Sequence, residues 1–145
     1  MRAIIFDFNR TLFDPDSRAL VSGTLQVLKA CRKRGFLLVL VSRRERGRQK
    51  SIASLSIKDY FRRIIITPKK SVKTFQRILR QLKADPSESY IVGDRVREEI
   101  VMGNTLGLRT IWVRQNIFAR EAPRNKKERP MFAVLNLRDV MRVVK

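Results

Sequence analysis

Side chains capable of phosphate and metal chemistry directly follow several short apolar segments of this sequence. In chain order, they are Asp7, Asn9, Thr11, Ser42, Lys69, Lys70, Asp94 and Glu99. Mg²⁺ is bound in proteins by one or two carboxylates together with substrate phosphate oxygens. A lysine and a hydroxyl can hold the other oxygens of a phosphoryl group and stabilise its charge. The residue types therefore indicate a site for a phosphate group and Mg²⁺.

Short apolar runs rich in β-branched residues alternate with amphipathic segments, which predicts alternating strands and helices. The predicted strands are residues 3–8, 36–41, 63–67, 90–92, 110–113 and 132–135. The predicted helices are residues 21–34, 43–56, 71–83, 98–106 and 137–144. Such alternation gives parallel strands joined by right-handed crossovers, so we expect an α/β fold. Its architecture would be a three-layer α/β/α sandwich around a parallel sheet of five or six strands.

The polar residues fall where such a sheet binds its ligands. Ligands of open parallel sheets bind beyond the carboxyl ends of the strands, where the strand order reverses. Asp7 lies at the end of the first predicted strand, Ser42 follows the second, and Asp94 follows the fourth. Each residue taken alone has an ordinary structural explanation, such as a turn or a helix cap. Because these explanations would have to coincide at successive strand ends, the joint pattern favours a functional site.

The sequence is strongly basic, with 33 Lys and Arg residues against 13 Asp and Glu residues and a formal net charge of +20. This charge favours anionic partners such as phosphates, or non-specific contact with nucleic acid or another polyanion. A solvated basic surface explains it equally well, since net charge alone concerns solubility and non-specific binding. The basic segments lack interleaved aromatic residues for base stacking, so sequence-specific nucleic-acid recognition is not supported.

The residue types that are missing also restrict the function. The chain has no histidine and a single cysteine, Cys31, which excludes Ser-His-Asp catalysis, His-ligated zinc and a disulfide framework. No apolar run approaches the roughly 20 residues that cross a bilayer, and the apolar start is too short for a signal peptide. We therefore expect one cytoplasmic domain over residues 1–145, without a membrane partner, in which residues 114–130 form a basic surface loop.

The motifs together resemble those of the haloacid dehalogenase-like (HAD) hydrolase superfamily, over essentially the whole chain. The segment "IIFDFNRTLFD" is similar to the first motif of that family, whose first Asp is the nucleophile, here Asp7. The segment "LVLVS" is similar to the second motif, with Ser42 as the phosphate-binding hydroxyl. Lys69 fits the lysine of the third motif, with Lys70 and Lys73 as alternatives.

The segment "IVGDRVREEI" is similar to the fourth motif, with Asp94 as a metal ligand and Glu99 as the second acidic position. The resemblance implies a HAD-like Rossmannoid sheet and Mg²⁺-dependent hydrolysis of phosphomonoesters through an aspartyl-phosphate on Asp7. The implied metal ligands are Asp7, the backbone carbonyl of Asn9, and Asp94. Glu99 would lie behind them, where it orients the water molecules of the metal or the motif lysine.

The resemblance also implies how a phosphorylated substrate is held. Lys69, Ser42, and Thr11 or its neighbouring amides would hold the equatorial phosphoryl oxygens. A basic run beginning beside Ser42 would attract a phosphorylated polyanion; it consists of Arg43, Arg44, Arg46, Arg48 and Lys50. Arg10 stands where a small residue is common in the family, and it either contacts the substrate or points to solvent.

Asn9 departs from the family pattern, because family phosphatases usually carry Asp there as the general acid and base. A carboxamide can neither protonate the leaving alkoxide nor activate water, and general acid–base catalysis is worth about 10²–10⁴-fold. Three interpretations stay open. The protein is a slow phosphatase, or one in which Asp14 or Asp16 supplies the proton; it is a catalytically weak protein that binds phosphate, polyanions or nucleic acid; or it acts on another bond.

The spacing between the motifs leaves no room for a cap domain. About nine residues separate Thr11 from the first predicted helix, and about four separate the third strand from the next helix. The chain is therefore expected to be a capless member whose site is open unless a partner or the 114–130 loop covers it. An open site admits a phosphorylated macromolecule as well as a small phosphorylated molecule.

Overall fold

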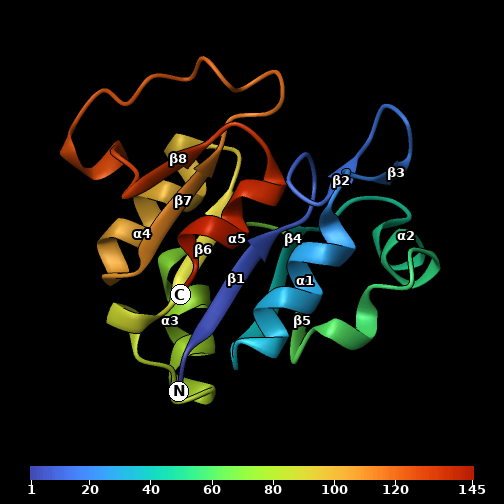
Figure 1. Cartoon of the computed structure of the whole chain (residues 1–145), viewed down its shortest axis with the longest axis horizontal. Coiled ribbons are helices and arrows are strands. Elements are labelled where there is room, and N and C mark those ends of the chain that lie inside the picture. The colour runs from blue at the N-terminus through green and yellow to red at the C-terminus, as the bar shows by residue number, and fades with distance from the viewer.

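Six parallel strands form the central sheet of the computed structural model, which describes residues 1–145 (Figure 1). Their order across the sheet is β5-β4-β1-β6-β7-β8. The bounds are Ala3–Asp7 (β1), Leu37–Arg43 (β4), Arg63–Thr67 (β5), Tyr90–Gly93 (β6), Arg109–Val113 (β7) and Phe132–Val134 (β8). Strand order reverses beside β1, because the chain runs from β1 to β4 and β5 and then crosses to β6 on the other side. The expected parallel α/β fold is confirmed.

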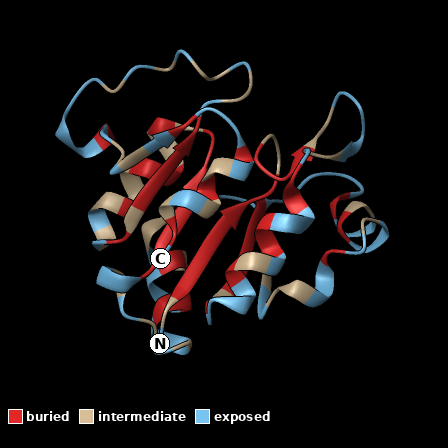
Figure 2. Cartoon of the chain, in the orientation of Figure 1, coloured by how far each residue is buried: buried red, intermediate tan, exposed pale blue.

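Five α-helices cover the two faces of the sheet. They are Thr24–Lys33 (α1), Arg48–Ser54 (α2), Val72–Gln81 (α3), Val101–Leu106 (α4) and Val140–Val143 (α5). Helices α1, α2 and α5 contribute to one apolar core and α3 and α4 to another, so the sheet lies between two helical layers. Neighbouring strand residues supply opposite cores: Phe6 packs in the first and Ile5 in the second. Figure 2 shows the central strands buried and the outer helix faces exposed.

The start of α3 is determined by its sequence. The Ser71 side chain accepts a hydrogen bond from the backbone N–H of Thr74 (3.2 Å), which caps the helix. Phe75, Ile78 and Leu79 then lie on its buried face at helical spacing. The cap holds the chain between β5 and α3 at the carboxyl edge of the sheet, where the motif lysine is expected.

The helix predicted from Glu98 to Leu106 begins earlier than expected. A π-helical turn, Val96–Ile100, precedes α4. Such turns are rare and often occur at functional sites. A Cβ atom added at Gly93 would lie only 2.6 Å from Cγ of Glu99, so the absence of a side chain on this glycine lets Glu99 pass over the end of β6.

The helix predicted over residues 43–56 is shorter than expected, since α2 begins at Arg48. Gly47 precedes it with φ of +78°, a left-handed conformation that glycine adopts without strain. Similarly, the predicted helix 137–144 is a 3-10 turn, Leu137–Asp139, followed by α5. Because α2 begins late, residues 44–47 form a loop between β4 and α2 at the rim of the sheet.

A small hairpin and a long loop lie at the carboxyl edge of the sheet (Figure 1). The antiparallel hairpin Phe13–Asp14 (β2) and Ala19–Leu20 (β3) is the only sheet structure between β1 and α1, so the absence of a cap domain is confirmed for this chain. The loop 114–130 contains one 3-10 turn, Lys126–Glu128. No helix in the structure has the length and apolar content needed to span a membrane.

Candidate active site

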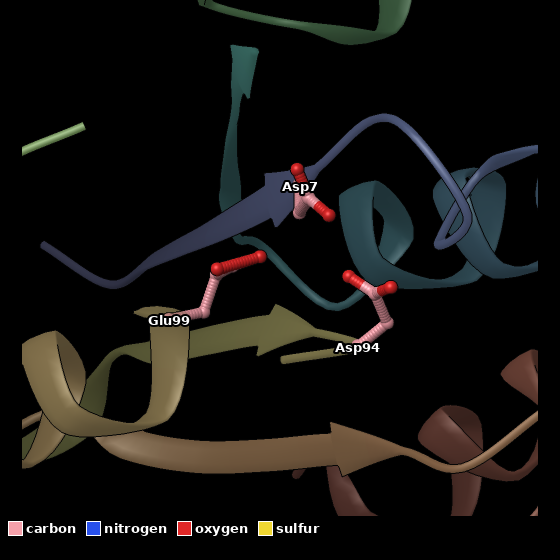
Figure 3. Close-up of side chains that lie close together, drawn as sticks. All are labelled: Asp7, Asp94 and Glu99. Atoms are coloured by element: carbon pink, nitrogen blue, oxygen red, sulfur yellow. The ribbon is translucent and has the colours of Figure 1, made fainter. Parts of the chain in front are cut away.

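Three buried carboxylates converge beyond the carboxyl ends of β1 and β6 (Figure 3). Asp7 is the last residue of β1, Asp94 directly follows β6, and Glu99 comes from the π-helical turn before α4. Carboxylate oxygens of all three lie within 4.8 Å of one another. The strand ends of the sheet therefore bring together residues that are far apart in the sequence.

A buried lysine neutralises part of this cluster. Nζ of Lys70 forms an ion pair with Oδ1 of Asp7 and lies 3.7 Å from Oε1 of Glu99. Burial opposes ionisation of Asp7, but the positive charge and hydrogen bond of Lys70 outweigh it and lower the pKa of Asp7 below its usual value. Burial also opposes the charge on Lys70, whereas Asp7 and Glu99 raise the pKa of Lys70 above its usual range. Asp7 is therefore ionised at neutral pH.

The other two carboxyl groups favour their protonated forms. The pKa of Asp94 is raised to about 8. Burial is the largest cause, and the negative charge of Asp7 is the second. The same two causes raise the pKa of Glu99 well above its usual value. Neither carboxylate oxygen of Glu99 accepts a hydrogen bond, although both are buried. A buried acceptor without a donor is uncommon and calls for a partner.

The carboxylate cluster is suited to a divalent cation. If all three carboxylates were ionised, the group would carry a net charge of −2 even with Lys70 included. Buried charge of this kind is costly unless a counter-ion offsets it. Carboxylate oxygens are ligands that hard cations such as Mg²⁺ prefer. Asp7, Asp94 and Glu99 are therefore the residues that could hold a metal ion.

Thr11 and Ser42 occupy different positions relative to the carboxylate cluster. Oγ1 of Thr11 donates a hydrogen bond to Oδ2 of Asp7 (3.2 Å), and Thr11 is fully buried. Its hydroxyl thus orients the Asp7 carboxylate, whereas we expected it to contact substrate. Ser42 lines the cavity in front of Asp7, and its Oγ donates to its neighbour's backbone carbonyl (3.0 Å). Ser42 therefore belongs to the lining of this cavity, with its hydroxyl proton directed to a backbone carbonyl.

The cavity in front of Asp7 has a volume of about 190 Å³ and an almost entirely polar lining. The lining residues are Asp7, Asn9, Arg10, Ser42, Arg43, Glu45, Arg48, Lys70, Asp94, Arg95, Glu98, Glu99 and Phe118. Asn9 and Arg10 are partly exposed at its edge. Arg10 therefore lies at the mouth of the cavity.

Two residues of the basic run after Ser42 line the cavity, and the other three lie outside its lining. Arg43 lines the cavity and pairs with Glu98 at 2.5 Å. Arg48 also lines it, is 6% exposed and pairs with Glu45 at 2.9 Å. The other three basic residues of the run, Arg44, Arg46 and Lys50, are exposed and lie outside the lining of this cavity.

Residues of the 114–130 loop complete the site. The sequence indicated that this loop could cover the site, but not which of its residues would reach it. Nδ2 of Asn116 donates to Oδ2 of Asp94 (3.2 Å) and to the backbone carbonyl of Arg10 (2.9 Å). The Arg95 guanidinium stacks over the Phe118 ring at 3.9 Å and pairs with Glu121 at 3.0 Å. The loop thus supplies one wall of the cavity and a hydrogen bond to Asp94. Its polar, aperiodic sequence contains no motif that would have indicated these contacts.

Comparisons with known proteins concern the family and the fold of the chain. A family model described as HAD-hydrolase-like matches residues 66–140, which is slightly more than half of the chain. The chain belongs to the HAD-hydrolase-like family. The resemblance predicted from the sequence motifs is therefore confirmed at the level of the family.

Two curated relatives of this HAD-hydrolase-like protein are glyceraldehyde 3-phosphate phosphatases. The protein from Pyrococcus abyssi is 30% identical over 98 residues, which cover 63% of this chain and 41% of the relative. The protein from Pyrococcus furiosus is 24% identical over 130 residues, which cover 86% of this chain and 54% of the relative. The chain spans about half the length of the curated relatives that it matches.

A solved structure has the same fold over almost the whole chain. It is a HAD phosphatase from Thermococcus onnurineus, with a TM-score of 0.84 and 13% sequence identity. The match covers 99% of this chain and 97% of the other. At this identity the comparison concerns the arrangement of the sheet and helices.

In this HAD-hydrolase-like protein, the lysine that reaches Asp7 is not the one that the sequence favoured. Lys69 is exposed, as is Lys73, whereas Lys70 is buried against Asp7 and Glu99. Lys70 directly precedes Ser71, the cap of α3, and the cap directs the chain so that this side chain points inward. The geometry replaces Lys69 with Lys70, one of the two alternatives left open, as the lysine beside the nucleophile position.

Replacing Lys70 should destabilise the fold much more than replacing Lys69. Without Mg²⁺, Lys70→Met leaves buried carboxylates with no cation, and loss of one partner from a buried ion pair costs about 3–5 kcal/mol. Lys69→Met should change stability by less than about 0.5 kcal/mol, because that side chain is exposed. Urea unfolding in the presence of a chelator measures the change in the free energy of unfolding for both variants. Equal effects of the two substitutions would contradict the assignment of Lys70.

The two acidic residues proposed as substitute proton donors, Asp14 and Asp16, are absent from the lining of the cavity with Asp7. Oδ1 of Asp14 accepts a hydrogen bond from the backbone N–H of Asp16 (3.0 Å), and Oδ2 accepts one from Ser17 (2.9 Å). These hydrogen bonds lower the pKa of Asp14; the bond from Asp16 is the largest cause, and the bond from Ser17 is the second. Asp14 and Asp16 line a different cavity. Neither position favours the hypothesis that one of them replaces the missing acid.

Proposed function

We propose that this protein is a Mg²⁺-dependent phosphomonoesterase that uses Asp7 as its nucleophile and turns over slowly because of Asn9. The observation that carries the proposal is the position of Asp7. Its carboxylate is ionised by Lys70, oriented by Thr11, and faces the polar cavity at the edge of the sheet. The similarity to glyceraldehyde 3-phosphate phosphatases supports the same class of substrate.

In the first step, a carboxylate oxygen of Asp7 attacks phosphorus while the bond between phosphorus and the leaving alcohol breaks. The product is an aspartyl-phosphate, and the alkoxide takes up a proton from water as it departs. In the second step, water attacks the same phosphorus, loses a proton, and releases Asp7 and inorganic phosphate. Ser42 and Lys70 line the cavity and would hold phosphoryl oxygens through both steps.

Asp7, Asp94 and the backbone carbonyl of Asn9 would hold Mg²⁺, with Glu99 beside them. When bound, Mg²⁺ offsets the repulsion between the attacking carboxylate and the negatively charged phosphate. Asn116 would keep Asp94 in place through its hydrogen bond to Oδ2. Glu99 would also hold Lys70 beside the phosphoryl group, since the two are 3.7 Å apart.

Mg²⁺ should bind more tightly as the pH rises from 6 to 8. A metal-bound carboxylate must be ionised, but the pKa of Asp94 is about 8 in the metal-free site, so binding below pH 8 must release a proton. Release of one proton strengthens the apparent affinity by about tenfold per pH unit, and the contribution of Asp94 to this gain ends above pH 8. Calorimetric titration with Mg²⁺ at several pH values measures how the apparent affinity depends on pH. An affinity independent of pH would contradict Asp94 as a ligand, and Asp94→Asn should lower the slope to the contribution of Glu99, whose pKa is also raised.

Asn9 should slow turnover without preventing metal binding, because the expected metal contact is its backbone carbonyl. Its side chain lines the cavity, but its amide N–H groups are too weakly acidic to act as a general acid. Two other carboxylates, Glu45 and Glu98, line the same cavity, and each is paired with an arginine. A leaving group that needs no protonation would therefore be released fastest.

A screen of phosphomonoesters in the presence of Mg²⁺ tests the proposed function. It should include glyceraldehyde 3-phosphate, the substrate in the name of the relatives, and an aryl phosphate whose leaving group needs little protonation. We expect turnover of the aryl phosphate that disappears on chelation of the metal. Absence of hydrolysis of every phosphomonoester would refute the proposal.

A second candidate function is supported by the formal charge of +20. Under this alternative, the protein binds phosphate or a polyanion such as nucleic acid and has little catalytic activity. Under this alternative, binding of the polyanion does not depend on the carboxylate cluster. Salt-dependent retention of an oligonucleotide, unchanged by replacement of Asp7 and accompanied by no phosphatase activity, would favour it.

A further inference from the structure

The cavity in front of Asp7 is too small to hold much more than a phosphoryl group. Its volume is about 190 Å³, whereas sites for small organic ligands commonly measure about 300–1,000 Å³. A second cavity of about 540 Å³ adjoins it. Asn9, Glu45 and Arg48 line both, so they form the boundary between them. The remainder of a substrate attached to the phosphoryl group can extend over this boundary.

The second cavity is strongly basic. It lies between the β2–β3 hairpin and α2, and Arg18, Arg46 and Arg48 line it with Glu45 as its only acidic residue. Arg18 and Arg46 form no ion pair within the protein, unlike Arg43 and Arg95 in the first cavity. A cleft lined by charge of one sign concentrates the opposite charge. The cavity is therefore suited to an anionic group.

Arg48 is held in a restricted position at the boundary between the two cavities. Its side chain is 6% exposed, lies over the Phe8 ring at 4.9 Å, and pairs only with Glu45. Its Nε is buried and donates no hydrogen bond. A guanidinium offers five N–H donors in a fixed plane, so one ion pair leaves donors free for a ligand. Packing against Phe8 restricts the side chain, so little conformational freedom is lost on binding.

Arg18 occupies its position against a backbone preference. Its φ is +57°, in the left-handed region where glycine is favoured and other residues carry a cost of about 1 kcal/mol or more. The residue lies in the turn between β2 and β3, at the rim of the basic cavity. Arg18 therefore places an unpaired cation at the rim of the basic cavity.

The other neighbouring cavity has the opposite character. It adjoins the first cavity at Arg10 and contains two acidic residues, Asp14 and Asp16, with Arg10 as its only cation. An anionic extension of the substrate would be repelled there. An anionic extension of the substrate is therefore favoured in the basic cavity and disfavoured in the acidic one.

We propose that the cavity between the β2–β3 hairpin and α2 binds a second phosphate group of the substrate. On the basis of the proposed function, the substrate class is a small phosphomonoester that carries a further phosphate away from the scissile one. The scissile phosphoryl group lies at Asp7, the linking atoms cross Asn9, and Arg18, Arg46 and Arg48 hold the second phosphate.

Non-hydrolysable ligands test this site independently of turnover. Calorimetry in Mg²⁺ and physiological salt compares α,ω-alkane bisphosphonates of increasing length with the corresponding alkane monophosphonates. The best bisphosphonate should bind about 10- to 100-fold more tightly, as one or two charge-assisted hydrogen bonds predict. A phosphonocarboxylate of equal length distinguishes a site selective for phosphate, which it fits poorly, from one that accepts any anion.

Matched arginine substitutions separate this site from general charge attraction. Arg46→Ala and Arg18→Ala should each reduce the bisphosphonate preference several-fold, and the double substitution should abolish it. Arg44→Ala removes the same charge from an exposed position outside the cavity and should leave the preference unchanged. Absence of a preference at every length, or equal loss in Arg44→Ala, would overturn the proposal.

The same proteins distinguish failure of this proposal from failure of the proposed function. Hydrolysis of an aryl phosphate by the wild type, together with no bisphosphonate preference, would overturn the second phosphate site alone. A preference that depends on Arg18 and Arg46 in a protein without phosphatase activity would support the site and refute the phosphatase function.

Discussion

Asp7→Asn should abolish hydrolysis of phosphomonoesters, lowering kcat by at least about 10³-fold. An amide is not a nucleophile toward phosphorus, and loss of a nucleophile removes the covalent route altogether. The substitution is nearly isosteric, so Thr11 and Lys70 keep a polar neighbour at the end of β1. Steady-state rates with an aryl phosphate in saturating Mg²⁺ measure the loss.

A folding control is needed because Asp7 also pairs with a buried lysine. After Asp7→Asn, Lys70 still lies near Glu99, and removal of the Asp7 charge makes ionisation of Glu99 easier. The variant should therefore remain folded, which circular dichroism and urea unfolding can establish. Thr11→Val is a matched comparison, since it removes one hydrogen bond to Asp7 but keeps the nucleophile. Equal activity of Asp7→Asn and the wild type would refute the assignment of the nucleophile.

The carboxylates of the site could be predicted from the sequence because parallel strands all end at one edge of the sheet. Once the apolar runs are assigned to strands, Asp7, Ser42 and Asp94 must lie at that edge, whatever the details of packing. The strand bounds are accordingly close to those predicted. Residues 63–67, for example, form β5 without change.

Side-chain directions and loop contacts could not be predicted in this way. The choice between Lys69 and Lys70 depends on a single residue of register in a short loop, where no hydrophobic period applies. Asn116 reaches Asp94 only because the 114–130 loop folds back along the sheet edge. The π-helical turn that brings Glu99 forward interrupts an otherwise ordinary helical pattern. Arg48 appeared only as one charge in a basic run, and its burial depends on packing against Phe8.

Asn9→Asp should raise turnover of alkyl phosphates by about 10²–10⁴-fold, the usual contribution of a general acid and base. The introduced carboxylic acid would protonate the alkoxide in the first step, and its conjugate base would activate water in the second. Asn9 lines both the cavity with Asp7 and the basic cavity, so in the proposed substrate orientation a carboxyl group there would lie between nucleophile and leaving group. Parallel measurement of kcat for an alkyl and an aryl phosphate tests the expectation.

The leaving group decides whether Asn9 is the cause of slow turnover. In the wild type, the aryl phosphate should react much faster than the alkyl phosphate, because an aryl oxide departs without a proton; Asn9→Asp should narrow that difference. The second step also needs a base, so the substitution should speed aryl phosphate turnover if hydrolysis of the aspartyl-phosphate limits it. No gain with either substrate would indicate that another group supplies the proton. Glu45 is then the carboxylate to test by Glu45→Gln, since it lines both cavities and is the more exposed of the two paired glutamates.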